Sequence, residues 1–279
     1  MPSCEPPAEI WDLDVPGFGE GFRKVRVLRP SGVEGCARTL VLLHGLGETH
    51  QPAQALRAWP TLYGASEADV RLRCPPFVPP GAKPRFWTNE SLARFNEGLA
   101  QRPYQGAILV CPRTPNPSLA SNRDKLFDAY SEWLCEAVLP AVEAQSPGAT
   151  KYVGLDGCSM GGYVAMEVLV RRAATFATAG CIQGALGQHR VVRYAALLAA
   201  LHEANPKFQF RIATSLGDPY LDVGKVLSKR LTDLGVAHEL DVVPGPHNQP
   251  WLCEIGTPRL LRWHDETLAG RAPTKAGTP

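Results

Sequence analysis

The chain has 279 residues, of which 44% are hydrophobic and 20% charged, and these values are typical of a globular protein. This length fits one large α/β domain at least as well as two small ones. The formal net charge is only +2, with both signs scattered along the chain, so we expect neither nucleic acid nor a membrane surface as a partner.

The first residues, MPSCEPPAEIWDLD, are acidic and rich in proline, without a basic segment that leads into an apolar one. This pattern argues against a secretory signal peptide and favours a cytoplasmic protein. The aliphatic stretch from Tyr194 to Leu201 is too short to span a bilayer. Eight cysteines include no CxxC pair with the spacing of zinc ligands, and without an export signal we expect them to be reduced.

The first half of the chain shows three strand-like stretches and one long helix. FRKVRVLRP alternates polar and apolar residues, RTLVLLHGLG is a buried strand ending in a Gly-rich turn, and YQGAILVCP is a second buried strand. From Arg123 to Glu143 the apolar residues recur at helical spacing, and SPG then stops the helix.

The second half alternates strands and helices regularly. The predicted order is strand KYVGL, helix YVAMEVLVRR, strand TFATAGCI, helix 191–203, strand FQFRIATSL, helix 223–234, strand VAHELDVVP and a closing helix over 260–268. Strands separated by such helices predict the α/β class, with a mostly parallel, doubly wound sheet covered by helices on both faces. Sites in such sheets form beyond the carboxyl ends of the strands.

One long segment, residues 50–102, interrupts this alternation. It contains PPFVPPGAKPRFWTNES and no clear structure, so we interpret it as a lid-like or cap-like insertion after the first Gly-rich turn. We expect residues 1–270 to form a single domain that includes this insertion, and residues 271–279, RAPTKAGTP, to be a disordered tail.

The stretch GLDGCSMGG, residues 154–162, lies between a predicted strand and a predicted helix, as a nucleophile elbow does. The turn is so sharp that side chains two residues before and after the nucleophile would collide, and Gly157 and Gly161 fit this requirement around Ser159. The same frame around Cys158 would place Asp156 and Met160 at the glycine positions. Ser159 is therefore the predicted nucleophile, and the alternative is a plain Gly-rich turn without chemistry.

A serine nucleophile needs a base and an orienting carboxylate. His247, in VVPGPHNQPW, follows the last predicted strand and is the predicted base. Asp218, in SLGDPYLD, follows the preceding strand and is the preferred acid, with Asp222 as the alternative because an acidic residue also suits a helix start. Ser, Asp, His is the chain order of α/β-hydrolases. We expect structural or surface roles for the other histidines: His44, His50, His189, His202, His238 and His264.

The reaction also needs backbone NH groups that stabilise an oxyanion. One is expected from Met160, which follows the nucleophile at the amino end of a buried helix. The second is expected from Leu46 in the turn LLHGLGE, where a plain strand-ending turn is the alternative.

The stretches WLCEAVLPAVEA, KYVGLDGCSMGGYVAMEVL, SLGDPY and PGPHNQPW resemble the putative-esterase family of α/β-hydrolases, which includes S-formylglutathione hydrolases (esterase D), enterochelin esterases, feruloyl esterases and mycolyltransferases. The resemblance runs from about residue 38 to 268. It implies the α/β-hydrolase fold, the triad Ser159, Asp218 and His247, and hydrolysis of a small-molecule ester or thioester through an acyl-enzyme, without a metal or an organic cofactor.

The chain departs from this family after the elbow helix, where RRAATFAT replaces a His-Pro-Asp-like turn, and within the insertion 50–102. Aromatic residues of the insertion, Phe86 and Trp87 among them, either wall an acyl or aryl pocket and bind substrate, or form the small core of a lid.

We predict a serine hydrolase of the carboxylesterase or thioesterase type. The alternatives are an acyltransferase or cyclising enzyme that uses the same acyl-enzyme, a peptidase variant, and a non-catalytic binding module. The sequence does not predict an oligomeric state.

Overall fold

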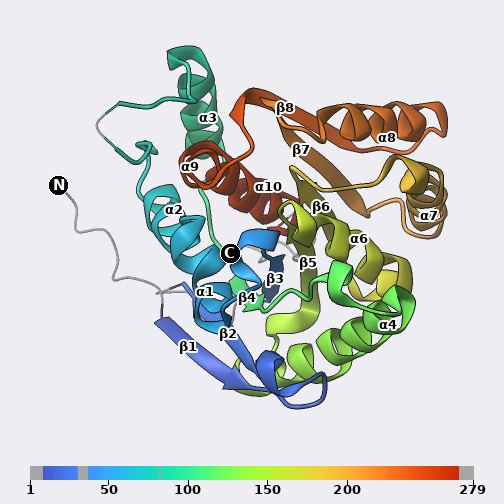
Figure 1. Cartoon of the computed structure of the whole chain (residues 1–279). Coiled ribbons are helices and arrows are strands. Elements are labelled where there is room, and N and C mark those ends of the chain that lie inside the picture. Colours follow the sequence, from blue (N-terminus) through green and yellow to red (C-terminus); the bar gives the residue numbers. More distant parts are fainter. Residues whose placement is uncertain (1–8, 31–36, 82, 270–279) are drawn as a thin grey trace, which may run out of the picture.

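Eight strands form one sheet at the centre of the molecule (Figure 1). A computed structural model describes residues 9–30, 37–81 and 83–269 of the chain, and the predicted tail 271–279 lies outside these residues. The strand order is β1-β2-β4-β3-β5-β6-β7-β8, parallel from β4 to β8, with β1 and β2 antiparallel at one edge. The strands are β1 (Glu9–Asp14), β2 (Lys24–Arg29), β3 (Arg38–Leu43), β4 (Ile108–Pro112), β5 (Tyr152–Gly157), β6 (Thr178–Ile182), β7 (Gln209–Gly217) and β8 (Glu239–Pro246).

Helices connect the strands and cover both faces of the sheet, so the predicted α/β class is confirmed. The α-helices are α1 (Pro52–Arg57), α2 (Ala65–Arg73), α3 (Asn89–Gln101), α4 (Arg123–Trp133), α5 (Leu139–Gln145), α6 (Met160–Arg172), α7 (Val191–Ala204), α8 (Leu221–Asp233), α9 (Gln249–Trp251) and α10 (Thr257–Ala269). The 3-10 segments are η1 (Glu20–Phe22), η2 (Leu46–Glu48), η4 (Pro117–Leu119), η6 (Ala149–Lys151), η7 (Ala173–Thr175) and η8 (Gln188–Arg190). The π-helical segments are η3 (Ala58–Leu62), η5 (Leu134–Val138) and η9 (Leu252–Gly256).

The central strands are apolar on both faces because each face has its own helical layer. In β3, Val41 and Leu43 belong to one core cluster, whereas Leu40 and Leu42 belong to the other. Helices α4, α6, α7 and α8 pack on the first face, and α2, α3, α9 and α10 lie on the second (Figure 1). A continuous run such as TLVLL is therefore typical of a strand buried between two layers.

The segment 50–102 is mostly helical, so the expectation that it lacks clear structure is wrong. Trp59, Leu72 and Phe95 from this segment share the second core cluster with Leu40 and Leu42 of β3. The segment thus covers the sheet itself. Helices α1 and α2 are short, and alanines, which form a weak apolar pattern, supply part of their buried side. Helix α3 has 13 residues but buries only Phe95 and Leu99 in its length.

One strand was not predicted, and one further expectation needs correction. The polar start of the chain includes β1, an edge strand whose Asp12 and Asp14 pair with Arg26 and Arg23 of the neighbouring chain segment. Cys74 is disulfide-bonded, so the expectation that all cysteines are reduced is wrong at this position, where no local spacing indicates a partner. The free cysteines of the described residues are Cys111, Cys135, Cys158, Cys181 and Cys253. Within the described ranges, no helix has the length and hydrophobicity needed to cross a bilayer.

Candidate active site

Ser159 lies in the turn between β5 and α6, with φ 54° and ψ −118°. A positive φ is uncommon for a residue other than glycine and marks a strained backbone. A Cβ atom on Gly157 would lie 2.3 Å from the carbonyl oxygen of Gly161, and one on Gly161 would lie 2.2 Å from that of Leu43. The close approach of these backbones therefore explains both glycines of the sequence frame. It also turns the serine side chain towards the carboxyl end of the sheet.

Cys158 is buried beside the serine, with 4% of its surface exposed. Burial raises the pKa of its thiol far above the usual range, so this sulfur stays protonated. Its environment is that of a packed side chain.

The structure brings together the three side chains that the sequence analysis singled out for the triad. His247 Nε2 lies 3.1 Å from the hydroxyl oxygen of Ser159, and His247 Nδ1 lies 2.9 Å from Asp218 Oδ1. A carboxylate only accepts hydrogen bonds, so Nδ1 carries the proton and Nε2 is left as an acceptor for the serine hydroxyl. Asp222, the alternative acid, is exposed in the first turn of α8 and bonds neither residue.

Asp218 is held in place by bonds that leave its carboxylate little freedom. Its side chain has no exposed surface. The hydroxyl of Thr214 donates to Asp218 Oδ2, and the backbone NH of Tyr220 donates to Oδ1 at 3.0 Å. These donors fix the position of the carboxylate that lies against the imidazole of His247.

The loop that carries His247 is fastened to the neighbouring strands. Gln183, at the end of β6, donates from its side-chain amide to the carbonyl oxygen of Pro246 at 3.0 Å and to Ser215 Oγ at 2.7 Å. Gln183 is, besides Ser159, the other described non-glycine residue with a positive φ, 48°. Trp251 Nε1 donates to the Pro244 carbonyl oxygen at 2.9 Å. These two bonds hold residues 244–246, which lead into His247.

The Gly-rich turn after β3 is organised by a buried histidine. The backbone NH of Thr114 donates to His44 Nε2 at 2.9 Å, so His44 Nδ1 carries the proton and donates to the Gly45 carbonyl oxygen at 2.9 Å. Burial lowers the pKa of His44 to about 4, which keeps the ring neutral near pH 7. The structural role expected for His44 agrees with this placement.

A second buried histidine explains Asp156 of the GLDGCSMGG stretch. His264 Nε2 lies 3.0 Å from Asp156 Oδ2, and His264 Nδ1 lies 3.0 Å from the hydroxyl of Thr178. This contact ties α10 to β5 and β6, and burial lowers the pKa of His264. His264 is therefore a packing residue, as expected from its position in the closing helix.

Three residues that the sequence analysis passed over connect the Gly-rich turn to the His247 loop. The backbone NH of Gly45 donates to the phenol oxygen of Tyr63 at 3.0 Å, and the phenol donates in turn to Glu48. Gln249 Nε2 donates to the other oxygen of Glu48 at 2.8 Å. Burial raises the pKa of Tyr63, so its hydroxyl remains a donor. We call Glu48, Tyr63 and Gln249 the clasp.

The two residues predicted to supply oxyanion donors both begin helical segments. Leu46 is the first residue of η2, and Met160 is the first residue of α6. Backbone NH groups at a helix start lack an intrahelical acceptor and point outward, which suits an anion. Leu46 is 49% exposed, whereas Glu48 and Tyr63 of the clasp are buried.

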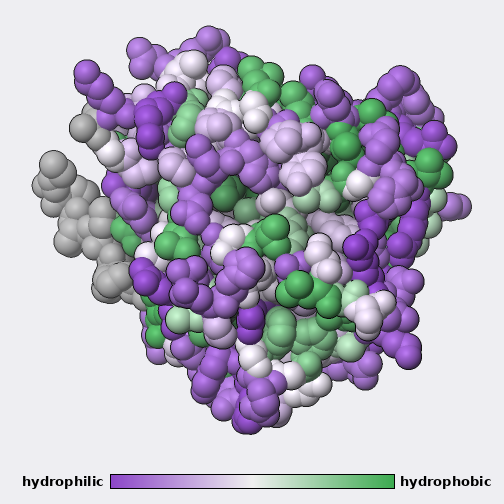
Figure 2. Space-filling model, viewed as in Figure 1, coloured by the Kyte–Doolittle hydropathy of each residue, from purple (hydrophilic) through white to green (hydrophobic). Residues whose placement is uncertain are grey.

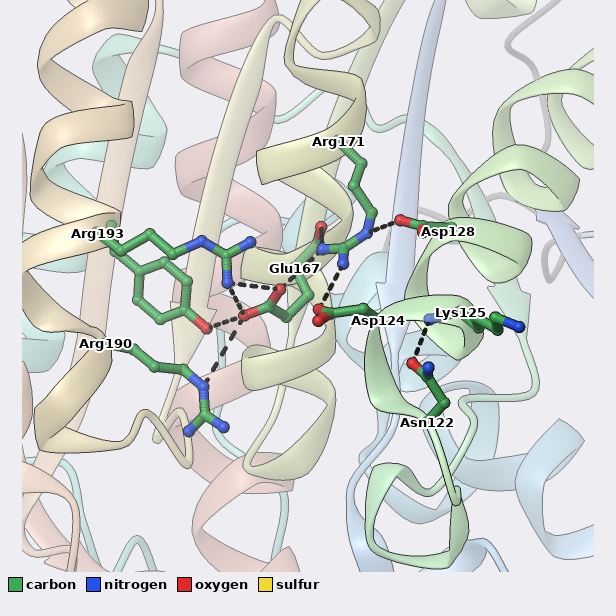
Figure 3. A network of polar contacts seen from close by, with 9 residues as sticks. Asn122, Asp124, Lys125, Asp128, Glu167, Arg171, Arg190 and Arg193 are labelled. Carbon is green, nitrogen blue, oxygen red and sulfur yellow. Dashed lines mark hydrogen bonds and ion pairs between the residues drawn. The ribbon is translucent and has the colours of Figure 1, made fainter.

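Helix α6, which begins immediately after Ser159, is anchored by a buried carboxylate (Figure 3). Glu167 is 1% exposed and accepts from Arg171 at 2.8 Å and from the Tyr194 hydroxyl at 2.7 Å. Arg193 and Arg190 approach the same carboxylate from α7 and η8 at 3.3 and 4.0 Å. Arg171 also pairs with two aspartates of α4. The network therefore links the elbow helix to both neighbouring helices.

The two aromatic residues predicted to bind substrate have different surroundings. Trp87 is 7% exposed, packs against Phe77 and Phe95, and donates from Nε1 to the Glu254 carbonyl oxygen at 2.8 Å. Phe86 is half-buried beside it, and its backbone NH donates to Glu254 Oε1. Trp87 thus contributes to the core of the segment 50–102, which favours the second of the two readings for this residue.

The chain matches one family model and is similar to several solved structures. The family model described as "Putative esterase" matches residues 112–251, half of the chain. No curated protein sequence matches it. Among solved structures, it is similar to a ferulic acid esterase, with a TM-score of 0.64 and 17% identity over 94% of this chain and 99% of that one.

Two further solved structures are similar at the same level. They are an S-formylglutathione hydrolase from Agrobacterium tumefaciens, with a TM-score of 0.55 and 18% identity over 94% and 95% of the two chains, and a fluorophosphonate-binding serine hydrolase from Staphylococcus aureus, with a TM-score of 0.60 and 15% identity over 93% and 99%. These similarities show the α/β-hydrolase fold, as predicted.

Proposed function

The chain belongs to the putative-esterase family, and on this premise we propose that it is a serine hydrolase that cleaves a carboxylic ester or thioester through an acyl-enzyme on Ser159. Family membership supports ester hydrolysis as the class of reaction. The observation that carries the finer proposal is the chain of contacts from Ser159 through His247 to Asp218, with distances of 3.1 and 2.9 Å.

In the first half of the reaction, Ser159 Oγ attacks the carbonyl carbon while His247 Nε2 takes the hydroxyl proton. The carboxylate of Asp218 stabilises the imidazolium that forms. The carbonyl oxygen becomes an oxyanion, and the backbone NH groups of Leu46 and Met160 are the proposed donors to it. When the tetrahedral intermediate collapses, His247 returns the proton to the leaving oxygen or sulfur, and the acyl group remains on Ser159.

In the second half, a water molecule attacks the acyl-enzyme and loses its proton to His247 Nε2. Collapse of the second tetrahedral intermediate releases the carboxylic acid and returns the proton to Ser159 Oγ. Each half-reaction thus moves one proton to the imidazole and back, which requires the neutral imidazole with the proton on Nδ1.

The experiment is hydrolysis of p-nitrophenyl acetate by matched pairs of variants. We expect Ser159→Ala to lower kcat by about a thousandfold or more, and Cys158→Ala to change it much less. Asp218→Asn should lower kcat by about a thousandfold, because the amide favours the wrong imidazole tautomer, whereas Asp222→Asn should stay within about twofold of the parent. Hydrolysis by Ser159→Ala at the parent rate would contradict the proposal.

A further inference from the structure

A pocket with a volume of about 870 Å³ opens on the side of the Gly-rich turn that faces away from His247. This volume lies within the range of sites that bind small molecules. Its walls include Phe18, Phe22, Thr49, Arg113, Leu119 and Leu126. We call it the β4 pocket, because Arg113 and the residues that follow it continue directly from β4. Figure 2 shows hydrophobic side chains below the centre of this face, where the chain leads from β4 towards α4 in Figure 1.

The sheet places the β4 pocket within reach of a group attached to Ser159. Strand β3 separates β4 from β5, and Ser159 follows β5. Neighbouring strands lie about 4.8 Å apart, so the end of β4 is about 10 Å from the end of β5. Thr49, in the wall of the pocket, lies only three residues beyond Leu46, the proposed oxyanion donor. An acyl chain of several carbon atoms spans this distance.

The position of His247 indicates whether the acyl group or the leaving group of the ester occupies the β4 pocket. The imidazole must protonate the leaving oxygen or sulfur, so the leaving group lies on the His247 side of Ser159. His247 follows β8, and its partner Asp218 follows β7, both on one side of β5. The β4 pocket lies on the other side. The geometry points to the β4 pocket as the site of the acyl group.

The lining of the pocket defines the chemical class of that acyl group. Its aromatic and aliphatic walls suit a bulky apolar chain or ring. Arg113 is a fixed part of the wall, since it donates to the carbonyl oxygens of Gly21 and Thr49 at 3.0 and 2.8 Å and lies 4.8 Å from the ring centroid of Phe22.

The ionisable side chains of the lining are all basic. Lys125 and His50 lie in it besides Arg113, and no Asp or Glu belongs to the described residues that line it. The substrates of this site are therefore esters of bulky, mainly apolar carboxylic acids whose far end is neutral or anionic. This inference rests on the proposed function of Ser159.

The test compares acyl chain lengths in a variant that fills the pocket. Ala129 lines the β4 pocket and is exposed, so Ala129→Trp reduces its volume without replacing a core side chain. The matched control is Ala200→Trp, an exposed alanine of α7 outside the lining. We expect the ratio of kcat/KM for p-nitrophenyl octanoate to that for p-nitrophenyl acetate to fall at least tenfold in Ala129→Trp. The same ratio should stay within twofold in the control.

A second variant and a second substrate pair keep the result decisive. Ala120→Trp, in the same wall, should show the same loss of the octanoate preference. Phenyl acetate and 2-naphthyl acetate vary the leaving group at a constant acyl group, and we expect the ratio of their kcat/KM values to be unchanged. The opposite result is a lower kcat/KM for 2-naphthyl acetate relative to phenyl acetate in both tryptophan variants, with an unchanged octanoate-to-acetate ratio. In that case the pocket holds the leaving group and the inference is overturned.

The charge preference has its own readout. The p-nitrophenyl monoester of octanedioic acid should be hydrolysed at least tenfold faster than the p-nitrophenyl ester of 8-aminooctanoic acid. Lys125→Glu should reduce this preference several-fold. Lys151→Glu, directly before β5 and so at the opposite end of the parallel strands, should leave it unchanged. Faster hydrolysis of the amino ester by the parent protein would overturn the charge assignment.

Failure of the inference is distinguishable from failure of the proposed function. If the parent protein hydrolyses p-nitrophenyl acetate and a fluorophosphonate labels Ser159, but neither tryptophan variant changes the octanoate-to-acetate ratio, only the assignment of the β4 pocket is wrong. If the parent protein neither hydrolyses p-nitrophenyl acetate nor becomes labelled, the proposed function is wrong and the assignment falls with it.

Discussion

The side-chain amide of Gln249 donates a hydrogen bond of 2.8 Å to the carboxylate of Glu48, two residues that lie 201 positions apart in the chain. Glu48 ends the segment that begins at Leu46, and Gln249 lies two residues beyond His247. The contact therefore joins the segment of the proposed oxyanion donor to the loop of the proposed base, through the buried Glu48 and the exposed Gln249. The phenol of Tyr63 completes it by bonding both Glu48 and the backbone NH of Gly45.

Tyr63→Phe should lower kcat for p-nitrophenyl acetate by about tenfold or more with a smaller change in KM. The substitution removes the partner of the Gly45 NH and one of the two partners of the Glu48 carboxylate, so the turn that carries Leu46 loses part of its support. Loss of a single oxyanion donor lowers turnover by roughly a hundredfold. Tyr104→Phe is the matched control, because the buried Tyr104 hydroxyl also donates to a carboxylate, Asp69 at 3.0 Å, outside the site. Equal kcat losses in the two variants would show that the clasp has only a structural role.

Gly161→Ala should destabilise the fold by at least about 2 kcal/mol, as judged by urea unfolding. The added Cβ would lie 2.2 Å from the Leu43 carbonyl oxygen, and both groups belong to backbone that cannot move freely. Gly47→Ala is the matched control, since nothing lies within 4 Å of a Cβ at that position. The elbow geometry described above is wrong if the two alanine variants are equally stable.

The free energy of unfolding should fall as the pH drops from 6.5 to 4, with a contribution from His44. Burial lowers the pKa of this ring from 6.5 to about 4, so the unfolded chain binds more protons in this window and acid favours unfolding. The difference corresponds to about 3 kcal/mol.

The measurement for His44 is urea unfolding of the parent protein and of His44→Asn between pH 4 and 7. The variant should be less stable at pH 7, because the Thr114 NH loses its acceptor, but its stability should depend less steeply on pH. Identical slopes in the two proteins would rule out a neutral, buried His44.

Glu167→Ala should destabilise the protein by at least about 2 kcal/mol, because it removes a buried carboxylate that the buried Tyr194 hydroxyl and the partly buried Arg171 share. The control is Glu136→Ala, which removes an ion pair with Arg172 from a side chain that is 60% exposed. Such exposed pairs contribute about 1 kcal/mol or less. The comparison uses urea unfolding, and a loss at Glu167 no larger than that at Glu136 would contradict the anchoring role of the network in Figure 3.

The sequence predicts those parts of the fold whose pattern is local. Strands such as TLVLL are continuous apolar runs because both sheet faces are covered, and the elbow is recognisable because Gly157 and Gly161 each meet a backbone carbonyl. Strand β1 escaped prediction because EIWDLD is an edge strand whose charged residues find partners on β2. The helices of 50–102 escaped it because their burial depends on the sheet that they cover.

The candidate site also has a part that the sequence predicts and a part that depends on the folded chain. Asp218 precedes α8 and Asp222 lies in its first turn, and only the position of His247, which follows the neighbouring strand β8, distinguishes them. The clasp has no local signature at all, since Glu48, Tyr63 and Gln249 meet only in the folded chain. The disulfide of Cys74 likewise depends on tertiary structure rather than on the spacing of cysteines.

The central claim is that the hydroxyl of Ser159, activated by the imidazole of His247, becomes covalently acylated. The most direct measurement is peptide mapping by mass spectrometry after treatment with a fluorophosphonate, for the parent protein and for His247→Ala. The account predicts one adduct, on the peptide that contains residue 159, formed at least a hundredfold more slowly in the variant. An adduct on another residue, or no adduct while p-nitrophenyl acetate is still hydrolysed, would contradict it.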